Sequence, residues 1–189
     1  MPMTATIEFR SPEGGFDEPL ALWLACHQRV LRFCTLLERL RVHVEHNGAD
    51  EEAATSARSI RRYFNEAAPR HHADEEVDLF PRLLRRLAEQ PAALSPDDDS
   101  RTRSAIEALT AEHRANEVLW SALDAALEQI ERGVVARLDS APVAAFGQTY
   151  RGHIEVEEGV VMPAMKRVFD TSDWADVGRA MAARRGVTA

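Results

Sequence analysis

Two stretches of the chain repeat one unusual order of residues. The segment HHADEEVDLFP (71–81) and the segment HIEVEEGVVMP (153–163) each place a histidine four residues before a pair of glutamates and then end on apolar residues and a proline. A solvated helix face would explain the charges and a core helix would explain the apolar run, but neither explains both. The repeat therefore predicts two related helices whose buried faces carry polar side chains with a specific role.

Apolar residues at spacings of three and four predict four amphipathic helices, and no segment alternates as a strand would. The expected helices lie at about 20–47, at about 51–90, from the acidic loop at 91–100 to residue 133, and at about 146–168. Pro69 and Pro81 interrupt the second helix and are expected to kink it. Four such helices with short connections predict an all-α fold, an antiparallel up-down four-helix bundle.

A length of 189 residues is most simply one domain. We expect an irregular N-terminal arm at 1–17, the bundle at 18–170, and a C-terminal arm or short helix at 171–189. The net charge of −8 disfavours binding to nucleic acid or to an anionic membrane. No apolar run reaches the roughly 20 residues of a membrane span, and no signal peptide is recognisable, so the expected location is the cytoplasm.

Each expected helix carries one histidine on its apolar face, and chain lengths place these histidines at one level of the bundle. His27 and His71 lie about equally far from the turn near residue 49, and Glu75 and His113 lie about equally far from the loop near residue 95. The third connection agrees less well. His113 and His153 reach one level only if the segment VVARLDSAP spans as much axial distance as a helix would.

The spacing His-x-x-x-Glu puts an imidazole and a carboxylate on one helix face, about one turn apart. Two such pairs and the two other histidines give six candidate ligands: His27, His71, Glu75, His113, His153 and Glu157. Six are too many for one zinc ion, which takes three or four protein ligands, whereas two iron ions bridged by two carboxylates use all six. Such a pair would leave room for a bridging oxygen and for an open position.

The two motifs resemble those of the hemerythrin-like family, also called the HHE cation-binding domain, over about residues 20–169. The first copy is close to the family motif, and the second is looser because Val161 and Met162 replace leucine and phenylalanine. The resemblance implies a hemerythrin-like bundle that holds two iron ions with an oxo or hydroxo bridge. It also implies that the six candidate residues are the ligands and that Glu75 and Glu157 bridge the irons.

A second register satisfies the same spacing, because His72 and Glu76 are also four residues apart. We prefer His71 and Glu75, since the second copy contains only His153 at this position. Phenylalanines seven residues upstream, Phe64 and Phe146, support the same alignment. Glu76 and its counterpart Glu158 are then either partners of the ligands or solvated acids.

Two further residues lie one helical turn from expected ligands. Oxygen-carrying hemerythrins have an additional histidine one turn after the third-helix ligand, and here Glu117 occupies that position, with Asn116 beside it. Either Glu117 fills a coordination position or both irons keep an open one, so the resemblance does not imply reversible oxygen carriage. Tyr150, one turn before His153, either donates a hydrogen bond to bound oxygen or packs in the core.

These residues predict a non-haem di-iron protein that binds or turns over a small oxidant: dioxygen, hydrogen peroxide or nitric oxide. Whether it is an enzyme stays open, with peroxide decomposition as the candidate activity. The alternative is an iron, oxygen or redox sensor, or an iron-handling protein, that acts through an unidentified protein partner by means of its terminal arms. A metal-free structural bundle is disfavoured, because it would bury four histidines and two glutamates without compensation.

Overall fold

The computed structural model describes residues 15–134 and 137–187, and the chain in these ranges is helical with no strand. The predicted all-α class is confirmed, while residues 1–14 of the expected N-terminal arm lie outside the described residues. None of the helices in these ranges has the length and apolar character required to cross a membrane. The elements are α1 Pro19–Asn47, α2 Glu51–Arg62, η1 Tyr63–Ala67, α3 Ala68–Ala73, η2 Asp74–Leu79, α4 Phe80–Glu89, α5 Pro96–Glu131, α6 Ser140–Val156, η3 Glu157–Val161, α7 Met162–Val168 and α8 Thr171–Arg184.

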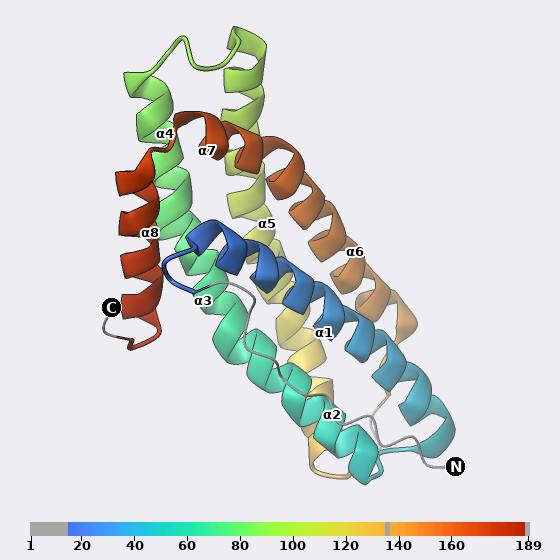
Figure 1. Ribbon diagram of the computed structural model, residues 1–189. Coiled ribbons are helices and arrows are strands. Elements are labelled where there is room, and N and C mark those ends of the chain that lie inside the picture. Colours follow the sequence, from blue (N-terminus) through green and yellow to red (C-terminus); the bar gives the residue numbers. More distant parts are fainter. Residues whose placement is uncertain (1–14, 135–136, 188–189) are drawn as a thin grey trace.

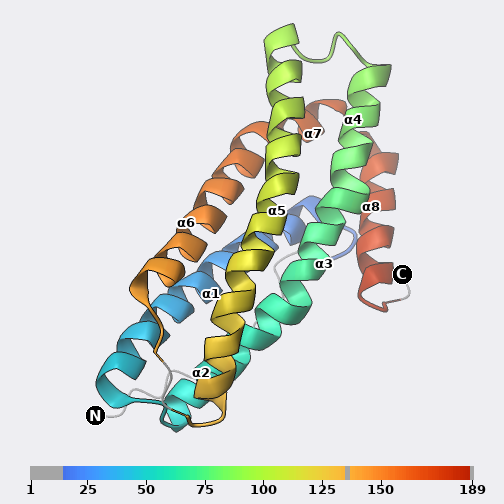
Figure 2. The same cartoon turned by 180° about the vertical axis from the view of Figure 1, so that it is seen from behind.

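The eleven elements form a bundle of long helical segments. α2 to α4 follow one another as one rod that is continued through η1 and η2, and α6, η3 and α7 form another (Figure 1). α1 packs against α2 and α6, and α5 packs against the same two helices from the other side (Figures 1 and 2). The last helix, α8, turns back and packs against α1 and η2.

Local sequence signals account for the helix ends. Asp50 and Ser95 are N-caps whose side chains accept hydrogen bonds from the backbone N–H groups of Ala53 and Asp98. Gly48, directly after α1, has a φ of 75°, which a residue with a side chain rarely adopts. The predicted stop of the first helix therefore lies where the sequence places it.

Three prolines each follow a short π-helical segment. Pro69, Pro81 and Pro163 lie in the first turns of α3, α4 and α7, directly after η1, η2 and η3. A proline has no N–H to donate and its ring collides with the carbonyl four residues earlier. A π turn, with its wider i to i+5 spacing, accommodates the break without ending the helix. The sequence predicts kinks at Pro69 and Pro81 but not this π-helical form of the break.

The core consists of two apolar clusters with a polar layer between them. One cluster includes Val30, Leu37, Phe64, Leu127 and Phe146, and the other includes Trp23, Leu79, Leu109, Val161, Met165 and Val177. On each long segment the buried histidine lies between residues of the first cluster and residues of the second. Val177 and Met181 of α8 belong to the second cluster, so α8 completes the apolar cover on that side of the polar layer.

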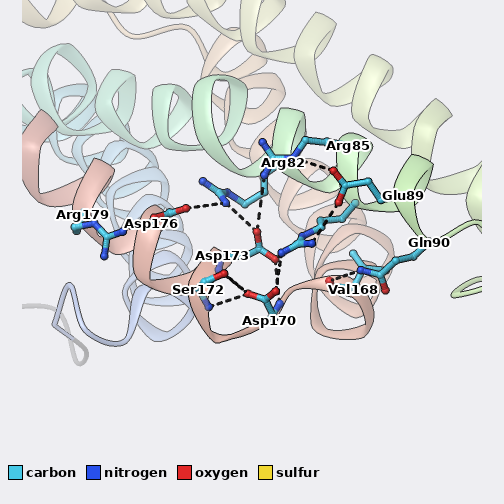
Figure 3. Close-up of polar contacts among 11 residues, drawn as sticks. Arg82, Arg85, Glu89, Gln90, Val168, Asp170, Ser172, Asp173, Asp176 and Arg179 are labelled. Carbon is cyan, nitrogen blue, oxygen red and sulfur yellow. Dashed lines mark hydrogen bonds and ion pairs between the residues drawn. The ribbon is translucent and has the colours of Figure 1, made fainter.

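An ion-pair network holds the beginning of α8 against α4 (Figure 3). Asp173 is buried and accepts hydrogen bonds from Arg82 at 2.8 Å and from Arg86 at 2.7 Å. Asp173 also completes a capping box with Asp170, the N-cap of α8. One carboxylate thus fixes both the start of α8 and its attachment to α4.

We expect Asp173→Ala to lower the midpoint of thermal unfolding by about 5 °C, because it leaves two guanidinium groups and a helix N-terminus without their shared partner. Asp176→Ala is the matched control, since Asp176 is partly exposed and pairs with Arg82 at the rim of the same network. Its effect should stay below about 1 °C. Equal shifts in the two variants, measured by circular dichroism, would contradict the role given to Asp173.

Candidate metal centre

Six buried side chains converge in the polar layer, and they are the six that the sequence singles out. Each is at most 3% exposed. They come from six elements and all four long segments: His27 from α1, His71 from α3, Glu75 from η2, His113 from α5, His153 from α6 and Glu157 from η3. Two of the three π-helical segments thus carry the two carboxylates, and such segments are frequent at functional sites.

The six residues form two groups of four that share both glutamates. One group is His27, His71, Glu75 and Glu157, and the other is His113, His153, Glu75 and Glu157. In each group the candidate ligand atoms lie within 4.8 Å of one another. The shared carboxylates therefore lie between two pairs of imidazoles.

Each carboxylate directs one oxygen toward each imidazole pair. Oε1 of Glu75 is 3.1 Å from Nε2 of His71, and its Oε2 is 3.3 Å from Nε2 of His113. Oε2 of Glu157 is 3.3 Å from Nε2 of His27, and its Oε1 is 3.3 Å from Nε2 of His153. This arrangement is what a carboxylate needs to bridge two cations.

The donor atoms fit metal cations. Two metal bonds of about 2.1 Å that meet near a right angle separate their donor atoms by about 3 Å, close to the spacings observed here. Within the described residues, five buried atoms of the cluster have no hydrogen-bond partner: Nε2 of His27, Nδ1 of His71, Oε2 of Glu75 and both carboxylate oxygens of Glu157. Buried polar atoms without partners are costly, and coordination to a metal would satisfy all of these except Nδ1 of His71, whose Nε2 is the atom beside Glu75.

Three further carboxylates orient the histidine rings. The Nδ1 atoms of three rings donate to glutamates: His27 to Glu158 at 2.8 Å, His113 to Glu76 at 2.7 Å and His153 to Glu112 at 3.0 Å. A histidine that donates from Nδ1 presents the lone pair of Nε2 to the centre. The Nε2 atoms of His113 and His153 lie 3.0 Å apart, so two lone pairs face each other, a repulsion that a shared cation relieves.

These contacts resolve one alternative left by the sequence and add two residues that it does not single out. Glu76 and Glu158 are partners of histidines rather than solvated acids. Glu112 lies beside His113 in the chain but bonds the histidine of another helix. Trp23 donates from Nε1 to Oε1 of Glu75 at 2.7 Å. Its position four residues before His27, on the same helix face, was the available signal.

The electrostatics of the two central carboxylates differ. Burial raises the pKa of Glu157 well above its usual range, and the neighbouring charge of Glu75 adds to this effect. Burial acts on Glu75 in the same sense, but its interactions with His71, His113 and His27 outweigh it and hold its pKa well below the usual range. Two adjacent buried carboxylates repel each other, and cations between them would favour the ionised form of both.

The remaining candidates lie outside both groups. The ring of His72 stacks on His113 at 4.0 Å between centroids, and its Nε2 is 3.4 Å from the hydroxyl of Tyr150. Burial lowers the pKa of His72 to about 4, with a further contribution from His113. Tyr150 is buried beside Phe64 and Phe146. Glu117 lies on the exposed side of α5.

The helical bundle and its buried histidine and glutamate cluster define a metal-cation-binding protein. Residues 18–165 match the hemerythrin HHE cation-binding domain, and the chain belongs to this family. An uncharacterized protein of Haemophilus influenzae is 32% identical over 173 residues, which cover 91% of this chain and 92% of that protein. The family resemblance inferred from the two motifs is confirmed.

Proposed function

We propose that the protein holds two iron ions bridged by Glu75 and Glu157 and that it binds or turns over a small oxidant at this pair. The observation that carries the proposal is the pair of four-residue groups with both glutamates in common. We also propose that the four long segments form the antiparallel up-down bundle predicted from the sequence, since this arrangement explains why residues far apart in the chain reach one level.

Each part of the cluster has a role in this proposal. His27 and His71 hold one ion, and His113 and His153 hold the other. Trp23 fixes the orientation of Glu75 through the hydrogen bond to Oε1. The two apolar clusters on either side exclude water from the layer. When bound, the irons supply two adjacent redox-active cations that can coordinate an oxidant.

Iron is favoured over zinc by the number and type of donors. Imidazole with carboxylate is a donor set that iron accepts, often with positions left for exogenous ligands. Two nitrogens and two carboxylate oxygens per ion leave a six-coordinate iron two positions that these residues do not fill. Zinc would be complete with the same four donors.

The test is a metal analysis of protein produced in iron-sufficient cells, together with its optical spectrum. We expect about two irons per chain and near-ultraviolet absorption from a ferric pair. One zinc per chain and no iron would rule out the proposal.

A second candidate function is that of a sensor, in which the state of the metal centre alters the binding of a partner. It is favoured by the ion pairs that join α8 to the segment carrying Glu75: Arg185 bonds Asp74, the residue directly before Glu75, at 2.6 Å, and Arg184 bonds both Asp74 and Asp78. An oxygen electrode separates the two functions. Sustained turnover of hydrogen peroxide supports an enzyme, whereas stoichiometric oxidation without turnover supports a sensor.

A further inference from the structure

Asn116 is a buried amide for which the described part of the chain offers no hydrogen-bond partner. Its side chain is 1% exposed, and both its Nδ2 and its Oδ1 are unpaired within that part. Burying an amide in this way costs stability, so an apolar residue of the same size would suit a purely structural position better. Asn116 lies three residues after His113 and therefore on the same face of α5, one turn from the metal layer.

Residue counting along α5 and α6 places Tyr150 near the level of Asn116, and His72 lies beside Tyr150. α5 and α6 pack side by side and run in opposite directions (Figure 1). Three residues after His113 on α5 thus correspond to three residues before His153 on α6, and that position is Tyr150. His72 connects the tyrosine to the centre, since its Nε2 is 3.4 Å from the Tyr150 hydroxyl and its ring stacks on His113.

Aromatic rings close the side of this group that faces away from the metal layer. Phe64 and Phe146 lie 5.0 Å apart between ring centroids, and they lie 5.7 Å and 5.1 Å from the ring of Tyr150. Both phenylalanines are buried. The Tyr150 ring is therefore separated from solvent on that side, and His72 beside it stacks on His113 of the His113 and His153 half of the centre.

We propose that Asn116, Tyr150 and His72 form a hydrogen-bonding site for the exogenous ligand on the His113 and His153 side of the centre. This inference rests on the proposed iron pair. The amide supplies two donors and an acceptor, and the hydroxyl supplies a donor and an acceptor. Such a set matches a ligand that carries its own O–H groups, such as hydrogen peroxide. Dioxygen has no proton to donate and is a weak acceptor, so these groups would contribute little to its binding.

Asn116→Leu tests the site with two independent readouts. In the metal-free protein the midpoint of thermal unfolding should rise by about 2–4 °C, because the substitution removes an unsatisfied buried amide at similar volume. In the oxidised, iron-loaded protein, the dissociation constant of azide, an anion that coordinates ferric iron and accepts hydrogen bonds, should rise by about tenfold or more. Asn65→Leu is the control, since Asn65 is exposed and bonds Trp120 and Asp124. It should leave azide binding unchanged.

Tyr150→Phe tests the hydroxyl, and the other tyrosine of the chain supplies its control. Tyr63 is also buried, but its hydroxyl bonds the backbone oxygen of Cys26 at 3.5 Å and its ring stacks on Phe33. Tyr150→Phe should slow the reaction of the reduced protein with hydrogen peroxide by about tenfold and change its reaction with dioxygen by less than about twofold. Tyr63→Phe should change neither rate.

The outcomes separate this inference from the proposed function. A wild-type protein without an iron pair overturns both. If the wild-type protein holds two irons but Asn116→Leu and Tyr150→Phe bind azide as tightly as the wild type does, the hydrogen-bonding site alone is overturned. A lower unfolding midpoint for metal-free Asn116→Leu also overturns it, because the amide would then have a structural role. Equal slowing with peroxide and dioxygen refutes the assignment of the ligand class.

Discussion

Replacing Glu75 or Glu157 by alanine is expected to remove most of the bound iron, and to remove both ions rather than one. Each carboxylate has one oxygen beside His27 or His71 and the other beside His113 or His153. Loss of either glutamate thus removes one donor atom from each ion. It also leaves one carboxylate charge, in place of two, to balance the two cations. Metal analysis after purification should give well below one iron per chain in both variants.

Glu76→Ala is the matched control, because Glu76 is the adjacent residue on the same segment. Glu76 orients His113 through Nδ1 and also bonds Arg114, but it belongs to neither group of four. The variant should still bind two irons at saturation, with an affinity lower by about 10-fold to 100-fold. If Glu76→Ala lost the iron and Glu75→Ala retained it, His72 and Glu76 would be the ligand pair and the chosen register would be wrong.

The sequence predicts most of the candidate site because helix geometry is local. A rise of about 1.5 Å and a turn of about 100° per residue determine which side chains share a face. The duplicated motif then selects His71 over His72, since the second copy offers a single histidine. Counting residues from the turns pairs His27 with His71, and the structure places these two rings 5.2 Å apart.

Counting from the third connection is less direct, because the helices on its two sides extend to unequal distances from their histidines. α5 ends at Glu131, 18 residues after His113, whereas α6 begins at Ser140, 13 residues before His153. An extended chain advances up to about 3.3 Å per residue, against about 1.5 Å in a helix, so residue counting across a connection between helices does not fix an axial distance. The 3.0 Å separation of the two Nε2 atoms shows that His113 and His153 reach one level.

The contacts that the sequence does not predict depend on how the helices are rotated against one another. Glu112 reaches His153 across the interface between α5 and α6, and Trp23 reaches Glu75 across the interface between α1 and η2. Spacing within a helix says nothing about such pairs. The π-helical segments are also hidden, because a proline indicates that the helical hydrogen bonding must break but not how the break is absorbed.

Removing the metal is expected to lower the midpoint of thermal unfolding by about 8–16 °C. Without cations, the polar layer buries two adjacent carboxylates, and five side-chain atoms of the six residues have no hydrogen-bond partner within the described residues. Ligands that bind only the folded state stabilise it by about 4 kcal/mol at a thousand times their dissociation constant, and 1 kcal/mol corresponds to about 2–4 °C in a chain of this size. The measurement is calorimetry before and after dialysis against a chelator under reducing conditions.

Glu157→Ala provides the control for this loss of stability. Because the variant should bind little iron, the chelator should leave its unfolding midpoint nearly unchanged. The metal-free variant should also be no less stable than the metal-free wild type, since the substitution removes a buried carboxyl group whose oxygens lack partners within the described residues. The lower unfolding midpoint of the wild type after metal removal would then arise from the loss of metal at this centre. A chelator effect of equal size in wild type and Glu157→Ala would instead point to a metal bound elsewhere on the chain.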